Sequence, residues 1–305
     1  MTATLGASSG SGAVYDRGYR PYDGPRGGRG ATRAALFRGS LRRALGLRRS
    51  WRQKVPPFVL LGVAVIPAVV NVGVKYLTRN TRVQDIGFFD YREYIGVSNT
   101  LLVFVALTAP DLFCPDRRQR VLPLYFSRPM TGADYVAAKA GAMFFLLFSF
   151  TVLPQVVLFV GQMLVTKDGS LNYFTANTDI LWKVPVACLL FSLYYAMLGS
   201  AVASLSSRRI TAGASIIGIL LVSAVVSGSI TGDPEEIGFE GHAAGLLDLL
   251  ALPMVIRDLI FLGHVDTGTS LSGVQNGGLG AVLVYTAVIV ASIATLIVRY
   301  DQVER

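Results

Sequence analysis

The chain has 305 residues, of which 52% are hydrophobic and 15% charged, and its formal net charge is +9. Soluble proteins carry roughly 25% charged residues, so this composition disfavours both a disordered protein and an ordinary soluble enzyme. The surplus positive charge lies within residues 1–54, so the net charge is not by itself a sign that the rest of the chain binds nucleic acid.

Residues 1–30 are rich in Gly, Ser and Arg and contain few aliphatic residues, so we predict a disordered basic tail. Residues 31–54 differ, because leucines and Trp51 fall on one half of a helical wheel and three arginines on the other. A basic amphipathic helix with a tryptophan on its apolar face suits a membrane interface. The alternative is a solvated basic helix in a tail.

Six apolar blocks follow, and each is long enough to cross a ~30 Å hydrocarbon core at about 1.5 Å per residue. They are residues 56–77, 94–113, 140–165, 181–205, 210–231 and 279–298. The sequence therefore predicts an all-α membrane protein with six transmembrane helices in a domain at 55–305.

A further apolar stretch at 243–262 contains Asp248, Arg257 and Asp258, and Pro253 divides it. Each charge costs ~3 kcal/mol at the centre of a bilayer, so we do not expect a seventh span. We expect instead a short re-entrant helix pair within an outer segment at 233–278, before the sixth span.

The basic residues predict the orientation of these spans. With the N-terminus in the cytoplasm, 21 basic residues lie on the inner side of the membrane and 7 on the outer side. We therefore expect a multi-pass protein of the plasma membrane with both termini cytoplasmic.

The sequence offers no recognisable catalytic or metal site. It has no GxxxxGK[ST] motif and no Ser/His/Asp set, and its two cysteines and two histidines form no ligand cluster. We expect that the chain itself is not an enzyme and binds no metal or cofactor.

The most informative segment is the inner loop at 114–139, which reads CPDRRQRVLPLYFSRPMTGADYVAAK. Thr131, three residues before Asp134, is a helix-start signal. On composition alone, this would be a cytoplasmic loop whose arginines face lipid headgroups.

The run from Asp116 to Lys139 closely resembles the coupling-helix region of permease subunits in type-2, exporter-like ABC transporters. Its strongest motif is LPLYFSRP at Leu122–Pro129, and the opening YDGPR at Tyr22–Arg26 resembles that of many actinobacterial members. The amphipathic helix, the six spans and the re-entrant pair fall in the matching places, so the resemblance covers about residues 20–305.

The resemblance implies a permease subunit that exports or flips a substrate, driven by ATP hydrolysis in a separate ABC ATPase subunit. It implies two copies of that ATPase, which bind ATP and Mg, and a second permease chain that is the same or homologous. By motif position, the residues expected to couple to the ATPase are Arg117, Arg118, Arg120, Tyr125, Arg128, Pro129 and Tyr135.

Polar residues inside spans by default face the bundle interior. The candidates for a substrate path are Asn71, Asn99, Gln155 and Gln162. Each can equally make a structural hydrogen bond between helices. Two other functions stay open: a non-transport membrane subunit that transmits ATPase movements to outside partners, and a secondary transporter. Short outer loops count against the first, and the lack of an internal repeat counts against the second.

Overall fold

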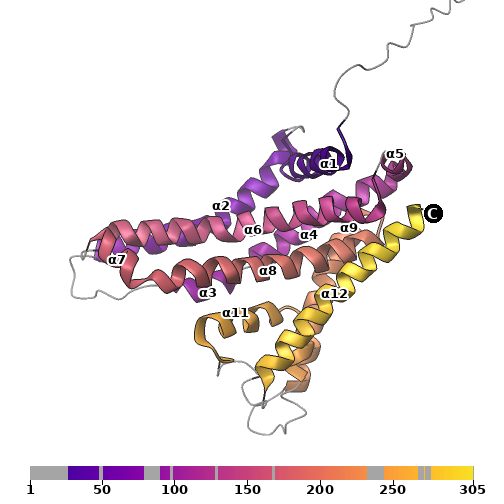
Figure 1. Ribbon diagram of the computed structural model, residues 1–305. Coiled ribbons are helices and arrows are strands. Elements are labelled where there is room, and N and C mark those ends of the chain that lie inside the picture. The colour runs from indigo at the N-terminus through magenta and orange to yellow at the C-terminus, as the bar shows by residue number, and fades with distance from the viewer. Residues whose placement is uncertain are drawn as a thin grey trace, which may run out of the picture.

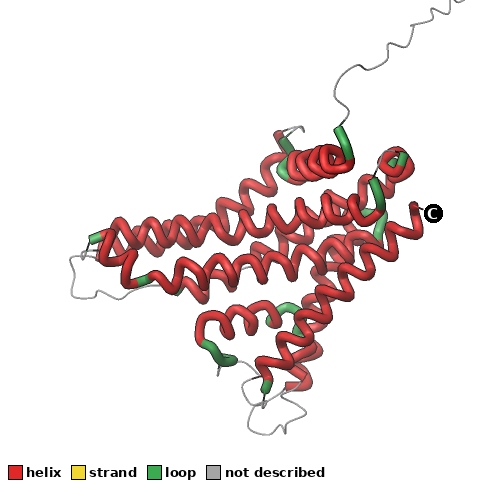
Figure 2. Tube along the Cα trace, in the orientation of Figure 1, coloured by secondary structure: helices red, strands yellow, loops and turns green. Residues whose placement is uncertain are grey.

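The structure, a computed structural model, is all-helical within the residues that it describes, with no strand among them (Figure 2). Those residues are 27–47, 51–78, 90–96, 99–127, 130–166, 169–231, 244–266, 271 and 276–304. The tail predicted to be disordered at 1–30 lies outside them except for its last four residues, of which Arg29 and Gly30 begin the first helix.

The described helices follow one another as a bundle. They are α1 (Arg29–Ala44), α2 (Trp51–Thr78), α3 (Tyr91–Gly96), α4 (Asn99–Arg118), α5 (Leu122–Phe126), α6 (Gly132–Val165), α7 (Ser170–Ala176), α8 (Thr178–Leu205), α9 (Arg209–Thr231), η1 (Ala244–Leu247), α11 (Leu252–Leu262) and α12 (Gly277–Glu304). Figure 1 shows α6 and α8 side by side with α7 joining them at one end. At the opposite end lie α1, α5 and the C-terminal end of α12. We call these the α7 end and the α1 end.

Five described helices are long and apolar enough to cross a membrane, which indicates a multi-pass membrane protein. The segments are Val55–Thr78, Gly132–Val165, Thr178–Leu205, Arg209–Thr231 and Gly277–Gln302. Five of the six predicted blocks coincide with them. The 34 residues of α6 make it about 50 Å long, so it is longer than a ~30 Å hydrocarbon core requires.

The remaining predicted block, 94–113, which is the second in chain order, corresponds to α3 and α4, and α4 is not among those five helices. This helix carries Asp111 and Asp116 toward its C-terminal end, which lowers its mean hydropathy. Most of its apolar residues are nevertheless buried in the bundle, where Val105 and Leu112 are both 0% exposed, although Val103 and Leu107 on another face are exposed. The helix therefore packs largely against other helices.

A glycine on α9 permits the close packing of α4. A Cβ atom at Gly213 would lie only 2.7 Å from the carbonyl oxygen of Ala106, so a larger residue would push α9 away from α4. Small residues at such crossings let two backbones approach, as is common between membrane helices.

The amphipathic segment predicted at 31–54 forms two helices and not one, so the predicted boundary is wrong. Gly46 follows α1 with φ 66°, and the Leu47 N–H donates to the Arg42 carbonyl at 3.0 Å. A left-handed glycine with this hydrogen bond is a Schellman motif, which ends a helix. Trp51 therefore begins α2 and does not belong to the amphipathic helix.

The apolar face of α1 packs on protein. The Phe37 ring meets the Phe145 ring of α6 edge-on, with the ring centroids 6.1 Å apart. Ser40 and Ala44, also on α1, are buried. This packing fixes α1 across the α1 end of the bundle.

Two short helical segments, η1 and α11, lie in the apolar stretch 243–262, and neither is long enough to span a membrane. Their charges find partners within the protein. Asp258 lies 3.0 Å from Arg92 of α3 and 2.7 Å from its neighbour Arg257. The Asp248 carboxylate accepts two backbone N–H groups at 2.9 Å just before α11 begins.

Candidate functional site

The predicted coupling loop, 114–139, lies at the α1 end of the bundle. The chain passes from the last turn of α4 through the five-residue helix α5 to the first turns of α6, and α1 packs on both α4 and α6 (Figure 1). We call residues 114–139 the α4–α6 segment. Most of it is helical, so it is a more rigid element than a loop.

The helix start predicted at Thr131 is confirmed. The Asp134 N–H donates to the Thr131 hydroxyl at 3.4 Å, and the Asp134 carboxylate accepts the Thr131 N–H at 3.2 Å. This reciprocal pair is a capping box, which fixes the first turn of α6. The same carboxylate binds α1, with Arg29 at 2.6 Å and Arg33 at 3.2 Å.

A buried ionic cluster joins α4, α6 and α1 around Asp116, which is 0% exposed. One carboxylate oxygen accepts from Arg43 of α1 at 2.6 Å. The other accepts from the Tyr135 hydroxyl at 3.0 Å and from the Lys139 ammonium. Lys139, 1% exposed, also donates to the Leu112 carbonyl. Each charge in the cluster is therefore paired and hydrogen-bonded, which a buried ion pair requires.

The α1 helix therefore holds both ends of the α4–α6 segment. Arg29 and Arg33 bind its α6 end, while Arg43 binds its α4 end. Burial by itself would lower the pKa of Arg43, but its hydrogen bond and ion pair with Asp116 leave that pKa above the usual value. The Arg43 pair is the stronger of the two braces, because the Arg29 and Arg33 side chains are about half exposed.

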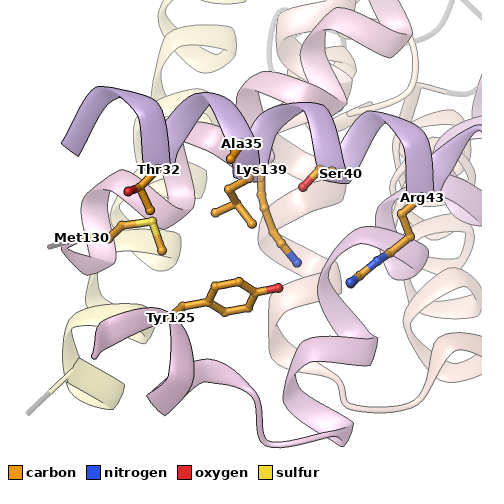
Figure 3. A pocket seen from close by; sticks show the side chains of 9 residues that line it. Thr32, Ala35, Ser40, Arg43, Tyr125, Met130 and Lys139 are labelled. Carbon is orange, nitrogen blue, oxygen red and sulfur yellow. The ribbon is translucent and has the colours of Figure 1, made fainter. Parts of the chain in front are cut away.

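A cavity of about 220 Å³ separates α1 from α5. Figure 3 shows the polar ends of Arg43, Tyr125 and Lys139 pointing toward one another beneath α1. The Tyr125 ring also stands 5.8 Å from the Tyr135 ring, measured between centroids. Tyr125 therefore connects α5 to the buried cluster.

Three of the four arginines predicted to couple to the ATPase are described, and they lie in different environments. Arg117 donates to the Ser204 carbonyl at the end of α8, so it holds two helices together. Arg118 and Arg120 are exposed. Arg118 also lines a cleft of about 1120 Å³ with Arg208 and Arg209, which follow α8. This cleft gives the α1 end a basic surface beside the α4–α6 segment.

Arg120 has an unusual backbone conformation, with φ 52°. It lies two residues after the last residue of α4, and the Val121 N–H donates to the Asp116 carbonyl at 3.1 Å. This is the position where glycine normally ends a helix, and a side chain there costs about 1 kcal/mol. Because an arginine here bears this backbone cost, its side chain is a candidate for a functional role.

Of the other predicted coupling residues, the structure describes two and leaves two out. Tyr135 is 0% exposed, so it cannot contact a partner directly and instead positions Asp116. Tyr125 is half-buried between the cavity and Tyr135. Arg128 and Pro129 lie outside the described residues.

The structure brings two of the four predicted substrate-path residues together. Gln155 and Gln162 both contact Tyr91: the Gln155 amide donates to the Tyr91 carbonyl at 3.2 Å, and the Tyr91 hydroxyl donates to Gln162 at 3.1 Å. Asn71 is buried in α2 at 1% exposure. Asn99 begins α4, and its side chain lies outside the described residues.

Sequence reasoning did not single out Arg43, Asp116 and Lys139 as one site. One signal was present, because Tyr135 and Lys139 are four residues apart and therefore lie on one face of a helix. The partner arginine is 73 residues from Asp116 in the sequence, and only the packing of α1 selects it.

The chain matches no protein-family model, and neither a curated protein nor a solved structure matches it. The fold and the α4–α6 segment are therefore the basis for any functional conclusion.

Proposed function

We propose that the chain is the permease subunit of a type-2, exporter-like ABC transporter, which exports or flips a substrate across the plasma membrane. ATP hydrolysis in a separate ATPase subunit drives the transport. The observation that carries this proposal is the α4–α6 segment, which combines exposed arginines with a rigid, buried brace. A surface that receives force from a partner needs both properties.

The geometry of the α4–α6 segment suits the transmission of movement from a bound ATPase to the membrane-crossing helices. The segment continues directly into α4 and α6, and α6 runs from the α1 end to the α7 end (Figure 1). Because the Asp116 cluster ties the segment to α1, a push on Arg118 or Arg120 moves α1, α4 and α6 together. Arginine makes bidentate contacts with carboxylates, so an acidic surface on the ATPase suits these residues.

We infer that α3 and α4 together form a sixth membrane crossing. The Tyr91 hydroxyl of α3 lies 2.8 Å from the Tyr173 hydroxyl of α7, whereas Asp116 near the end of α4 binds α1. This pair of helices thus extends from the α7 end to the α1 end. Six crossings leave both termini in the cytoplasm, and η1 with α11 then forms the re-entrant pair on the outer side.

The purified chain is expected to hydrolyse no ATP by itself and to co-purify with a separate ATPase subunit. The physical reason is that its sequence has no phosphate-binding loop of the GxxxxGK[ST] type. The measurement is a pull-down with a candidate ABC ATPase subunit from the same cells, followed by an ATPase assay of each fraction. Hydrolysis by the chain alone, with contaminating ATPases excluded, would contradict the proposal.

The orientation predicts opposite labelling at the two ends of the bundle. In intact cells, a membrane-impermeant thiol reagent should label Ala176→Cys at the α7 end and leave Gln119→Cys unlabelled. Both positions are exposed, and the native Cys114 and Cys188 are buried, so background labelling is low. The reverse pattern would invert the orientation and remove the α4–α6 segment from the cytoplasm.

A further inference from the structure

A second cavity lies near the α7 end, between α3, α6 and α8. Its volume is about 150 Å³, and its walls are largely apolar: Val152, Val156 and Phe159 of α6 face Ile180 and Val184 of α8 across it. It is separate from the α4–α6 segment, and the proposed coupling to an ATPase makes no use of it.

One buried polar atom at this cavity lacks a partner. Gln155 lines the cavity and is 2% exposed, and its amide nitrogen donates to the Tyr91 carbonyl at 3.2 Å. Its carbonyl oxygen Oε1 has no hydrogen-bond partner among the described residues. If the nitrogen and oxygen of the Gln155 amide were exchanged, its carbonyl oxygen would face the Tyr91 carbonyl oxygen, and no hydrogen bond could form. The hydrogen bond to Tyr91 therefore identifies Oε1 as the unpaired atom.

The neighbouring polar groups are already occupied. The Tyr91 hydroxyl lies 3.1 Å from Gln162 and 2.8 Å from the Tyr173 hydroxyl. A buried water typically makes about three hydrogen bonds, and this cavity offers it one free acceptor. Because buried acceptors rarely stay unpaired, Oε1 suits a ligand that brings a single donor and is otherwise apolar.

The cavity lies at the side of the bundle. Val156 is 52% exposed and Leu181 is 42% exposed, and both belong to helices apolar enough to cross a membrane. A ligand can therefore reach the cavity from the hydrocarbon phase of the bilayer. Its size is limited, because an apolar cavity of about 150 Å³ in another protein holds one benzene ring.

We propose that this cavity binds a small apolar molecule, about the size of one aromatic ring, whose single hydroxyl donates to Gln155 Oε1. A phenolic group has this chemistry. As a statement about the transported substrate class, the inference rests on the proposed transport function. As a statement about binding, it concerns this chain alone and requires no ATPase.

The test compares two probes that differ in one donor, para-fluorophenol and para-fluoroanisole, on the full chain in lipid nanodiscs. Binding is measured by fluorine NMR titration. The phenol is expected to bind about tenfold more tightly, because methylation removes the donor to Oε1. Equal binding of the two probes would overturn the role of Gln155, and binding of neither would overturn the cavity as a site.

Variants locate the site. Gln155→Leu should remove the preference for the phenol, and Val152→Phe should fill the cavity and abolish the binding of both probes. Val160→Phe is the matched control, since Val160 is on the same helix, is 42% exposed and does not line the cavity. Unchanged phenol binding in Val152→Phe would contradict the proposal.

A pull-down of the ATPase by the same variants separates the two proposals. If the chain associates normally with the ATPase but does not bind the phenol, only the proposed ligand site is contradicted. If the chain binds the phenol but recruits no ATPase, only the proposed transporter function is contradicted.

Discussion

Replacing Lys139 by methionine is expected to destabilise the folded chain by about 3–5 kcal/mol. The substitution keeps most of the side-chain volume but leaves Asp116 buried without its closest cation. Of its two described cations, Asp116 then keeps only Arg43, which is partly exposed, so the buried carboxylate is under-compensated, and this is the origin of the cost. The measurement is equilibrium unfolding in mixed detergent micelles, followed by tryptophan fluorescence.

The matched control is Lys183→Met, which removes a lysine from a weak pair. Lys183 lies 3.8 Å from Asp179, whose side chain is 77% exposed, so we expect a change of less than about 1 kcal/mol. The double variant Asp116→Leu with Lys139→Met should lose less than the sum of the two single variants, because both members of the most buried pair are removed and only Arg43, whose side chain is 32% exposed, loses its partner. Additive losses would show that the two groups do not interact as described.

The helices themselves are predictable from the sequence. Apolar length predicted α2, α6, α8, α9 and α12 as membrane-crossing segments, because the bilayer imposes a minimum length. The capping pattern of Thr131 and Asp134 predicted the start of α6, because this hydrogen bonding is local. Both signals depend on residues that are close together in the chain.

Signals that depend on tertiary packing were missed. The end of α1 was predicted too late because apolar periodicity continues to Trp51 while Gly46 turns the chain. In the buried cluster, Asp116 binds Arg43, which is 73 positions away in the sequence, and Lys139, which is 23 positions away. These three side chains meet only when α1, α4 and α6 have packed together. Among the arginines of α1, the structure pairs Arg43 with Asp116, whereas Arg29 and Arg33 pair with Asp134.

Because Arg120 has a positive φ, replacing it by glycine removes its side chain without destabilising the fold. This substitution therefore tests whether the side chain contacts the ATPase. Arg120→Gly should keep or slightly raise stability, because glycine accepts φ 52° without strain. Combined with Arg118→Ala, it should nevertheless abolish most transport if these exposed side chains contact the ATPase. A fold that is intact while transport is lost separates docking from structure. The measurements are a pull-down of the ATPase subunit and export of the substrate by the same variant.

The charge-matched control is Arg38→Ala with Arg42→Ala, which removes two exposed cations from α1 at the same end of the bundle. If arginines there serve only to bind lipid headgroups, both double variants should behave alike. Normal ATPase association together with normal export in the Arg118/Arg120 variant would rule out docking through these side chains. Normal association with lost export would assign them to force transmission, because the ATPase would then be bound to the segment without moving α4 and α6.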